Sequence, residues 1–174
     1  KTLNIFDSDI ITKEQAHEEV EKKLQKDVEV RKQINFDPGY LEKSWIKNCF
    51  AVGLSANFVE PLEASSIGTS IQQAFLLSHY IINYNQKTID KFNNTMEHIM
   101  LNIRDFICLH YITPRKEQFW KTQVMPDSLK DRLELFKTRL PIREDFNETN
   151  YLLFRDPNYI VVMHGLGLID IEKI

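Results

Sequence analysis

Residues 48–73, which read NCFAVGLSANFVEPLEASSIGTSIQQ, constrain the fold most, because the backbone must change its conformation within them. A short apolar run leads into a turn with two acids, Glu60 and Glu63, and a helix is expected to begin at Ser65 and Ser66. The first N–H groups of a helix lack partners within the helix and favour a negative charge. The stretch therefore predicts that a carboxylate and a bound anion lie side by side.

The same residues also have a purely structural explanation. Glu60 and Glu63 can compensate the helix dipole while Ser65 or Ser66 caps the helix. The functional explanation makes Glu63 a base, or an electrostatic partner of a developing cation. Spacing alone favours the structural explanation, and both remain open at this point.

Upstream of residue 48, the pattern predicts a small β portion with one helix. Residues 3–6 and 28–36 are strand-like, and the second segment has apolar side chains at alternate positions. Thr12 begins a capping-box pattern that predicts a helix over 13–26. The apolar run 49–54 lacks clean alternation, which indicates a strand covered on both faces.

Helical periodicity takes over after Ser65. Apolar residues recur at helical spacing over 65–82 and again over 88–111, and Pro114 ends the second helix. A shorter helix is expected over 128–139. The predicted fold class is α+β, a mainly helical chain with a few strands.

Composition limits the classes of function. The chain has 174 residues, enough for one domain, and its net charge of -3 gives no basic surface of the kind that binds nucleic acid. It has no apolar run of the ~20 residues that a membrane helix needs. Cys49 and Cys108 lie far apart, which favours a reduced, cytoplasmic setting, and no metal-ligand spacing is present. The chain starts at Lys1 rather than Met, and we expect it to be the remainder of something longer.

A second group of candidate residues is aromatic. His110 and Tyr111 end the long predicted helix, and Phe119 and Trp120 follow in the next segment. Aromatic side chains in such positions often form the wall of a pocket, and equally often they close a core. The sequence pattern by itself favours the core.

At NCFAVGLSANFVEPLEASSI, the sequence resembles flavin-dependent halogenases of the tryptophan halogenase type. Their usual pattern there combines NC-x-A-x-G-L with F-[VI]-E-P-L-E-S-T-[GS]-I. The likeness extends to Phe36-Asp37-Pro38-Gly39-Tyr40, to the segment from Asp105 to Trp120, and to Gly165-Leu166-Gly167. The resemblance thus covers most of the chain.

This resemblance implies a chemistry in which reduced FAD, oxygen and halide yield hypohalous acid. The acid then halogenates an electron-rich, indole-like aromatic substrate in a separate pocket. The matching positions acquire the following implied roles: catalysis and substrate contact for Glu63, halide binding by the backbone amides of Ser65 and Ser66, flavin contact for Leu54 and Ile67, and a substrate wall of His110, Tyr111, Phe119 and Trp120.

Departures from the family pattern narrow what the resemblance implies. Ser66 stands where many members have Gly, and a positive φ there would cost roughly 1–2 kcal/mol. Residues 115–118 lack the usual Asp-Thr/Ser-Pro run, so tryptophan itself is not assigned as the substrate. The family's glycine loop, its lysine and its W-x-W-x-I-P motif lie upstream in the family, and none occurs here.

We therefore expect residues 1–64 to be the end of an FAD-binding domain of the flavin-monooxygenase type, which their strands complete. Residues 65–174 are expected to form a helical substrate-side subdomain. The expected partners are the N-terminal remainder of the enzyme and a separate flavin reductase, and the fragment alone should be inactive. Two alternatives remain: a flavin-dependent aromatic hydroxylase, which halide dependence would distinguish, and a non-catalytic helical interaction module.

Overall fold

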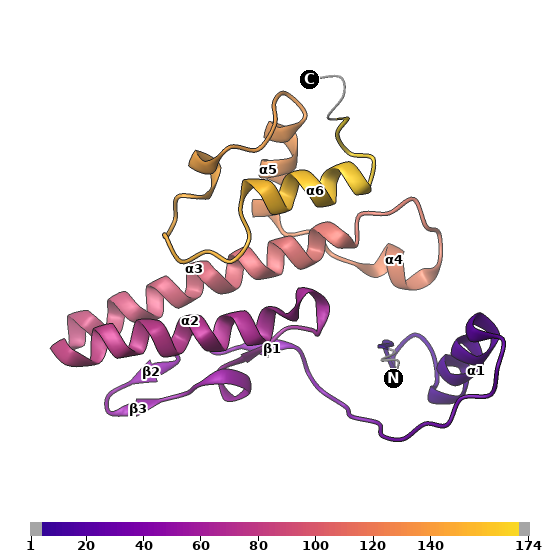
Figure 1. Cartoon of the computed structure of the whole chain (residues 1–174), viewed down its shortest axis with the longest axis horizontal. Coiled ribbons are helices and arrows are strands. Elements are labelled where there is room, and N and C mark those ends of the chain that lie inside the picture. The colour runs from indigo at the N-terminus through magenta and orange to yellow at the C-terminus, as the bar shows by residue number, and fades with distance from the viewer. Residues whose placement is uncertain (1–4, 171–174) are drawn as a thin grey trace. The chain divides into compact units, whose positions relative to one another are not determined.

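The structure is a computed structural model that describes residues 5–170, and it is mostly helical with a few short strands, as predicted (Figure 1). Its α-helices are α1 (Lys13–Leu24), α2 (Ser65–Tyr80), α3 (Gln86–His110), α4 (Gln118–Thr122), α5 (Asp127–Phe136) and α6 (Asp156–Gly165). Its strands are β1 (Gly39–Tyr40), β2 (Trp45–Ile46), β3 (Cys49–Phe50) and β4 (Asn57–Phe58). Short 3-10 turns lie at Gly53–Ser55, Leu62–Ala64, Ile81–Asn83 and Arg143–Phe146. The strands form two antiparallel pairs, β1 with β4 and β2 with β3.

The chain divides into two compact units, and each is described by itself. One unit combines residues 5–36 with Pro114–Gln123 and contains α1 and α4. The other combines Asp37–Thr113 with residues 124–170 and contains the remaining elements. These units are defined by contacts within the described chain. The proposed division at residue 64 refers to the domains of a whole enzyme and stays a prediction.

Helix α3 is the centre of the larger unit. It begins after Asn85, whose side-chain Oδ1 accepts a hydrogen bond from the backbone N–H of Thr88 at 3.0 Å, and the helix predicted over 88–111 is confirmed. In Figure 1, α2 and the strands lie along one side of α3, and α5 and α6 lie along the other; α3 contacts α2, β2, α5 and α6. Its fully buried apolar side chains are Ile89, Phe92, Met96, Ile99, Met100, Ile103, Phe106, Ile107 and Leu109.

Two buried asparagines of α3 hold the main chain of irregular segments on its two sides. Asn93 accepts a hydrogen bond from the N–H of Trp45 at 3.0 Å and donates one to the carbonyl of the same residue at 2.8 Å. Asn102 makes the same pair of bonds with Phe154, at 3.0 and 2.8 Å. Residues nine positions apart on a helix of 3.6 residues per turn point in opposite directions. Each asparagine side chain thus provides the hydrogen-bond partners for one backbone N–H and one backbone carbonyl.

The N-terminal predictions are partly correct. The helix over 13–26 is confirmed as α1, and its capping box forms, since the N–H of Gln15 donates to Thr12 Oγ1 at 3.3 Å and the N–H of Thr12 donates to Gln15 Oε1 at 2.8 Å. For the strand predicted over 3–6, residues 3 and 4 lie outside the described residues, and Ile5 and Phe6 are not in a strand.

The strand predicted over 28–36 is wrong. The N–H of Val28 donates to the Glu21 side chain at 2.9 Å, and its carbonyl accepts a hydrogen bond from His17 Nε2 at 2.7 Å. Side chains of α1 therefore take the place of a strand partner at the start of this segment. Residues 29–36 are exposed, so their alternating apolar pattern faces no sheet in the described chain.

The prediction of a covered strand over 49–54 is also wrong. Only Cys49–Phe50 forms a strand, in a hairpin with Trp45–Ile46, and Cys49 is exposed. The chain then turns at Gly53, which has a φ of 60°, and the side chain of Leu54 is 71% exposed. The apolar character of the run thus reflects a surface and not a buried strand.

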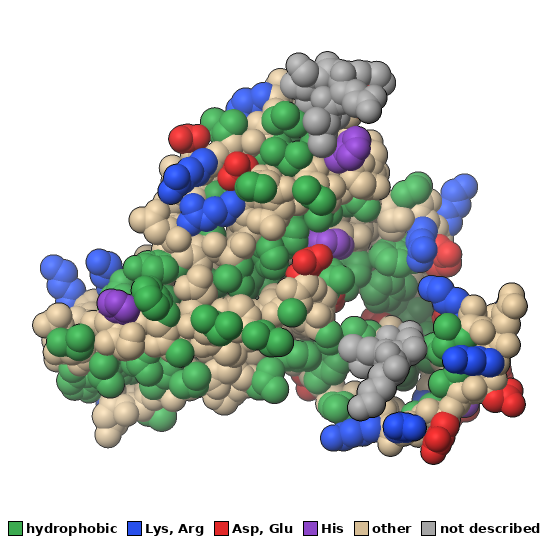
Figure 2. Space-filling model, in the orientation of Figure 1, with side chains coloured by type: hydrophobic (Ala, Val, Ile, Leu, Met, Phe, Trp, Pro, Cys, Tyr) green, Lys and Arg blue, Asp and Glu red, His purple; other side chains and the backbone are tan. Residues whose placement is uncertain are grey.

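Helix α2 confirms the helix predicted after Ser65, but its apolar stripe faces outward. Ile67 and Ile71 are each 65% exposed, and Phe75 is 49% exposed. The side of α2 that packs inside carries Ser65, Thr69, Gln73 and Leu76. Hydrophobic side chains accordingly gather over α2 on the face that Figure 2 shows.

The last predicted helix, over 128–139, is confirmed as α5, with Leu129 and Phe136 buried. The apolar run at 159–163 lies in α6, where Tyr159 and Met163 are buried. Within residues 5–170, no helix combines the length and the apolar character that crossing a membrane requires.

We predict that Asn102→Ala lowers the free energy of unfolding by about 2–4 kcal/mol, because a buried N–H and a buried carbonyl of Phe154 lose their partner. Asn94→Ala is the matched control, since Asn94 lies exposed on the same helix. Urea unfolding followed by circular dichroism measures both variants. Equal stability of the two variants would contradict the role given to Asn102.

Candidate active site

The acidic turn, residues 60–66, reverses the chain through two consecutive left-handed residues. Glu63 has a φ of 58° and Ala64 a φ of 51°, and α2 begins at the next residue, Ser65. A left-handed conformation costs a residue with a side chain roughly 1–2 kcal/mol. Such strain persists only where the surrounding structure enforces it, and it is common at functional sites.

The start of α2 is fixed by polar contacts. Thr69 donates its hydroxyl hydrogen bond to Asn57 Oδ1 at 2.9 Å, which joins α2 to β4. Gln73 accepts a hydrogen bond from the N–H of Gly53 at 2.9 Å, which joins α2 to the turn after β3. Thr69 and Gln73 thus anchor α2 through its buried polar side, while its apolar stripe faces outward.

The two serines of the predicted anion site differ in their surroundings. Ser65 is buried, and its backbone N–H donates to the carbonyl of Leu62. The Ser66 hydroxyl is buried and has no hydrogen-bond partner among the described residues. Ser66 lies within α2 and has no positive φ, so the strain expected there is instead found at Glu63 and Ala64.

The carboxylate of Glu63 faces the last turn of α3. Glu63 Oε1 lies 3.5 Å from His110 Nε2, and the two side chains are 45% and 21% exposed, respectively. On the other side of the imidazole ring, His110 Nδ1 lies 2.8 Å from the carbonyl oxygen of Phe106. The Glu63 carboxylate is therefore partly open to solvent, whereas the His110 ring is held by a contact within its own helix.

Tyr111, directly after α3, contacts Glu60, the other acid of the turn. The hydroxyl of Tyr111 donates a hydrogen bond to Glu60 Oε2. Burial raises the pKa of Tyr111, and the hydrogen bond to Glu60 raises it further. Two consecutive residues at the end of α3 thus contact the two acids of the acidic turn.

The remaining predicted site residues lie elsewhere. Leu54 and Ile67 are strongly exposed on the larger unit. Phe119 and Trp120 belong to α4 in the other unit, where their rings meet edge to face with centroids 5.1 Å apart. The structure therefore brings Glu63, His110 and Tyr111 of the predicted set together.

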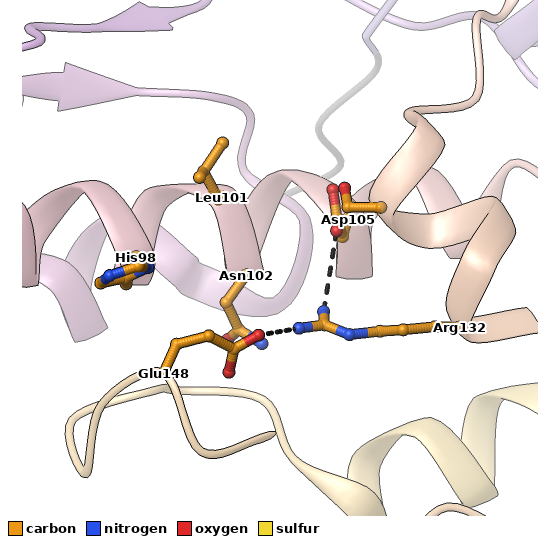
Figure 3. A pocket seen from close by; sticks show the side chains of 7 residues that line it. His98, Leu101, Asn102, Asp105, Arg132 and Glu148 are labelled. Carbon is orange, nitrogen blue, oxygen red and sulfur yellow. Dashed lines mark hydrogen bonds and ion pairs between the residues drawn. The ribbon is translucent and has the colours of Figure 1, made fainter. Parts of the chain in front are cut away.

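A second polar cluster, which no sequence pattern indicates, lines a cavity of about 140 Å³ between α3, α5 and the segment before α6 (Figure 3). Its charged centre is Arg132, which forms ion pairs with Asp105, at 3.6 Å, and with Glu148. Asp105 is buried and also pairs with Arg104 at 2.8 Å. These contacts join three segments of the larger unit, and the cavity shares no lining residue with the acidic turn.

Comparison with known proteins identifies the family. The tryptophan halogenase family model matches residues 3–172, and the chain therefore belongs to that family. It is 38% identical over 115 residues to a 7-chloro-L-tryptophan 6-halogenase, KtzR, from Kutzneria sp., an alignment that covers 61% of this chain and 22% of the relative. It is 33% identical over 144 residues to the tryptophan 6-halogenase SttH from Streptomyces toxytricini, covering 77% of this chain and 27% of the relative.

Solved structures agree with this assignment. A thermophilic tryptophan halogenase, Th-Hal, described as from Streptomycin violaceusniger, matches 95% of this chain with a TM-score of 0.83 and 31% identity. BrvH, a flavin-dependent halogenase from Brevundimonas sp. BAL3, matches 95% with a TM-score of 0.79 and 29% identity. The chain spans 34% and 35% of those two structures. It thus corresponds to about a quarter to a third of the relatives that it matches.

We predict that the stability of the chain declines as pH rises above about 10, the ordinary pKa of tyrosine. The pKa values of Tyr111 and Tyr159 are raised in the folded state, mainly by burial, so the unfolded chain loses these protons first. Unfolding in urea between pH 8 and 11 should show a shallower decline for Tyr111→Phe than for the wild type. Tyr84→Phe, at an exposed position, controls for the loss of a hydroxyl. An unchanged decline in Tyr111→Phe would contradict the prediction.

Proposed function

We propose that this chain is the C-terminal part of a flavin-dependent halogenase that uses reduced FAD, oxygen and halide to halogenate an electron-rich, indole-like aromatic substrate. The observation that carries the proposal is the acidic turn, where strained backbone holds the Glu63 carboxylate against His110, directly before the start of α2. Family membership supports the reaction class.

In this proposal, Glu63 acts on the substrate ring. Its half-exposed carboxylate can accept a proton from a ring carbon or stabilise positive charge that develops on the ring. Tyr111 and His110 fix the turn from the end of α3 and line the substrate side. Phe119 and Trp120 stay proposed substrate contacts because they match the family's aromatic segment, and an aromatic ring is a suitable partner for an indole.

The halide is proposed to bind at the backbone amides of Ser65 and Ser66. The N-terminal end of a long helix suits a negative ion, because its N–H groups and its dipole both favour one. A halide would share the Ser65 donor with the Leu62 carbonyl, and the buried hydroxyl of Ser66 is a further polar group without a protein partner among the described residues.

The residues proposed to contact FAD fit a flat, largely apolar ring system. Leu54 and Ile67 present exposed apolar side chains close to the acidic turn in the sequence. When bound, the reduced flavin and oxygen supply the oxidising equivalent that turns halide into an electrophilic halogen species. A separate flavin reductase is the proposed source of reduced flavin.

The outward-facing stripe of α2 supports a further partner, the N-terminal remainder of the enzyme. Ile67, Ile71 and Phe75 recur every four residues and are about half exposed or more. A continuous apolar stripe of this kind marks a surface that another protein segment covers. The proposed division of the whole enzyme places the FAD-binding domain before residue 65 and the helical subdomain after it.

We predict that Glu63→Gln in the complete enzyme lowers the rate of halogenation by about 10²–10⁴-fold, the usual contribution of a general base. Product formation is measured by mass spectrometry with reduced FAD, a flavin reductase and bromide or chloride. Glu97→Gln is the control, because Glu97 is an exposed glutamate on α3. Full activity of Glu63→Gln would remove Glu63 from the mechanism.

The same assay separates halogenation from hydroxylation. We expect no aromatic product when halide is omitted, and halogenated product when it is restored. A hydroxylated product that forms without halide, with no halogenated product in its presence, would show the hydroxylase alternative. Absence of both products, with intact FAD binding, would favour a non-catalytic role.

We predict that Ile71→Lys changes the stability of the isolated chain by less than about 0.5 kcal/mol, because Ile71 is 65% exposed there. In the complete enzyme, the same substitution should lower the melting temperature and weaken FAD binding, since a charge would be buried at the covered stripe. Thermal unfolding of both proteins and FAD fluorescence measure these effects. Asn94→Lys, at an exposed polar position of α3, is the control.

A further inference from the structure

Glu63 and His110 present two hydrogen-bond acceptors to each other. His110 Nδ1 lies 2.8 Å from the carbonyl oxygen of Phe106, and a carbonyl can only accept, so Nδ1 carries a hydrogen. A neutral imidazole has one N–H and one lone pair, so the lone pair of neutral His110 is on Nε2. That nitrogen is the atom that faces Glu63.

The distance between the two acceptors agrees with this assignment. Glu63 Oε1 and His110 Nε2 are 3.5 Å apart, whereas a charge-assisted N–H···O bond is about 2.7–2.9 Å long. A single added proton would turn the facing acceptors into such a bond.

Both members of the pair are held in place. The ring of His110 is fixed by the Phe106 carbonyl and by edge-to-face contact with the Phe106 ring, with centroids 4.9 Å apart. Glu63 is fixed by the left-handed backbone of the acidic turn, which the bond between Tyr111 and Glu60 ties to the end of α3. A shift of a few tenths of an ångström in the Glu63 side chain therefore suffices to form the bond to His110.

We propose that His110 is the positioning and proton-sharing partner of Glu63 in halogenation, an inference that rests on the proposed function. The halogen–oxygen bond of hypohalous acid breaks with its electrons on oxygen, and ring π electrons form the carbon–halogen bond. Glu63 then removes the proton from that carbon, and the C–H electron pair restores the aromatic ring. The proton comes to rest between Glu63 Oε1 and His110 Nε2, and it leaves with the hydroxide as water.

This arrangement gives His110 a specific effect on one step. With His110 present, the proton is held by two groups and does not return to the ring carbon. Without it, Glu63 alone is a poorer acceptor, and loss of the ring proton limits the rate. Deuterium at the reacting carbon then slows the reaction, because a C–D bond breaks more slowly than a C–H bond.

The test compares His110→Gln with His164→Gln in the complete enzyme, using an indole-like substrate that the wild type halogenates, with either hydrogen or deuterium on the ring. His164 is exposed in the last turn of α6 and lies outside the proposed site. We expect His110→Gln to lower kcat by about 10–100-fold with little change in KM, and to raise the deuterium isotope effect on kcat above that of the wild type. His164→Gln should match the wild type in all three quantities.

An isotope effect in His110→Gln equal to that of the wild type would overturn the proposal, whatever the loss of activity. A wild-type enzyme that makes no halogenated product would instead refute the proposed function, and the variants would then not be compared. For a His110→Gln variant that fails to fold, ¹⁵N NMR of the wild-type chain supplies the test. A neutral His110 with its hydrogen on Nδ1 supports the proposal, and a hydrogen on Nε2 overturns it.

Discussion

The paired hydrogen bonds from α3 to the main chain on its two sides are the constraint on which the rest of the larger unit depends. Asn93 holds Trp45 and Asn102 holds Phe154, each through one donor and one acceptor. The strands here are only two residues long, so they cannot satisfy their own backbone or fix their own position. A buried asparagine side chain supplies the hydrogen-bond donor and acceptor that a neighbouring strand would otherwise provide. The two asparagines together fix both segments relative to the long helix α3.

The position of α3 also affects the acidic turn, because residues at the C-terminal end of α3 contact that turn. His110 and Tyr111 lie at this end and contact Glu63 and Glu60. The turn contains consecutive left-handed residues without glycine, a conformation that short-range preferences oppose. The contacts from α3 are therefore part of what keeps the turn in its strained form, and a change in the core of α3 would be felt at the Glu63 carboxylate.

The parts of the fold that were predicted correctly are those that local sequence determines. Apolar periodicity specifies α1, α3 and α5, because each helix satisfies its own backbone, and a side-chain cap adds to this at α1 and α3. The segment 28–36 alternates as a strand does, but a strand needs a partner, and side chains of α1 took that place. The acidic turn was recognisable, whereas its contacts were not: Tyr111 and Glu60 lie 51 positions apart, and no local pattern encodes such a pairing. The sequence pattern indicates the apolar stripe of α2. Whether that stripe faces outward depends on which other segments pack against the helix.

The two acids of the turn, Glu60 and Glu63, have the same chemistry and lie three positions apart, so only their environments can separate their roles. Glu60 Oε2 accepts the hydrogen bond of the half-buried Tyr111 phenol, whose pKa is raised, so this proton stays on Tyr111 and the contact is a fixed structural link. Glu63 instead lies 3.5 Å from His110 Nε2, and its side chain is 45% exposed. Paired carboxylates that divide into a structural and a chemical member in this way are a recurring means of assigning acid–base roles in enzymes. In the proposed mechanism, the different roles of Glu60 and Glu63 are thus set by the order of two side chains, His110 and then Tyr111, at the end of α3.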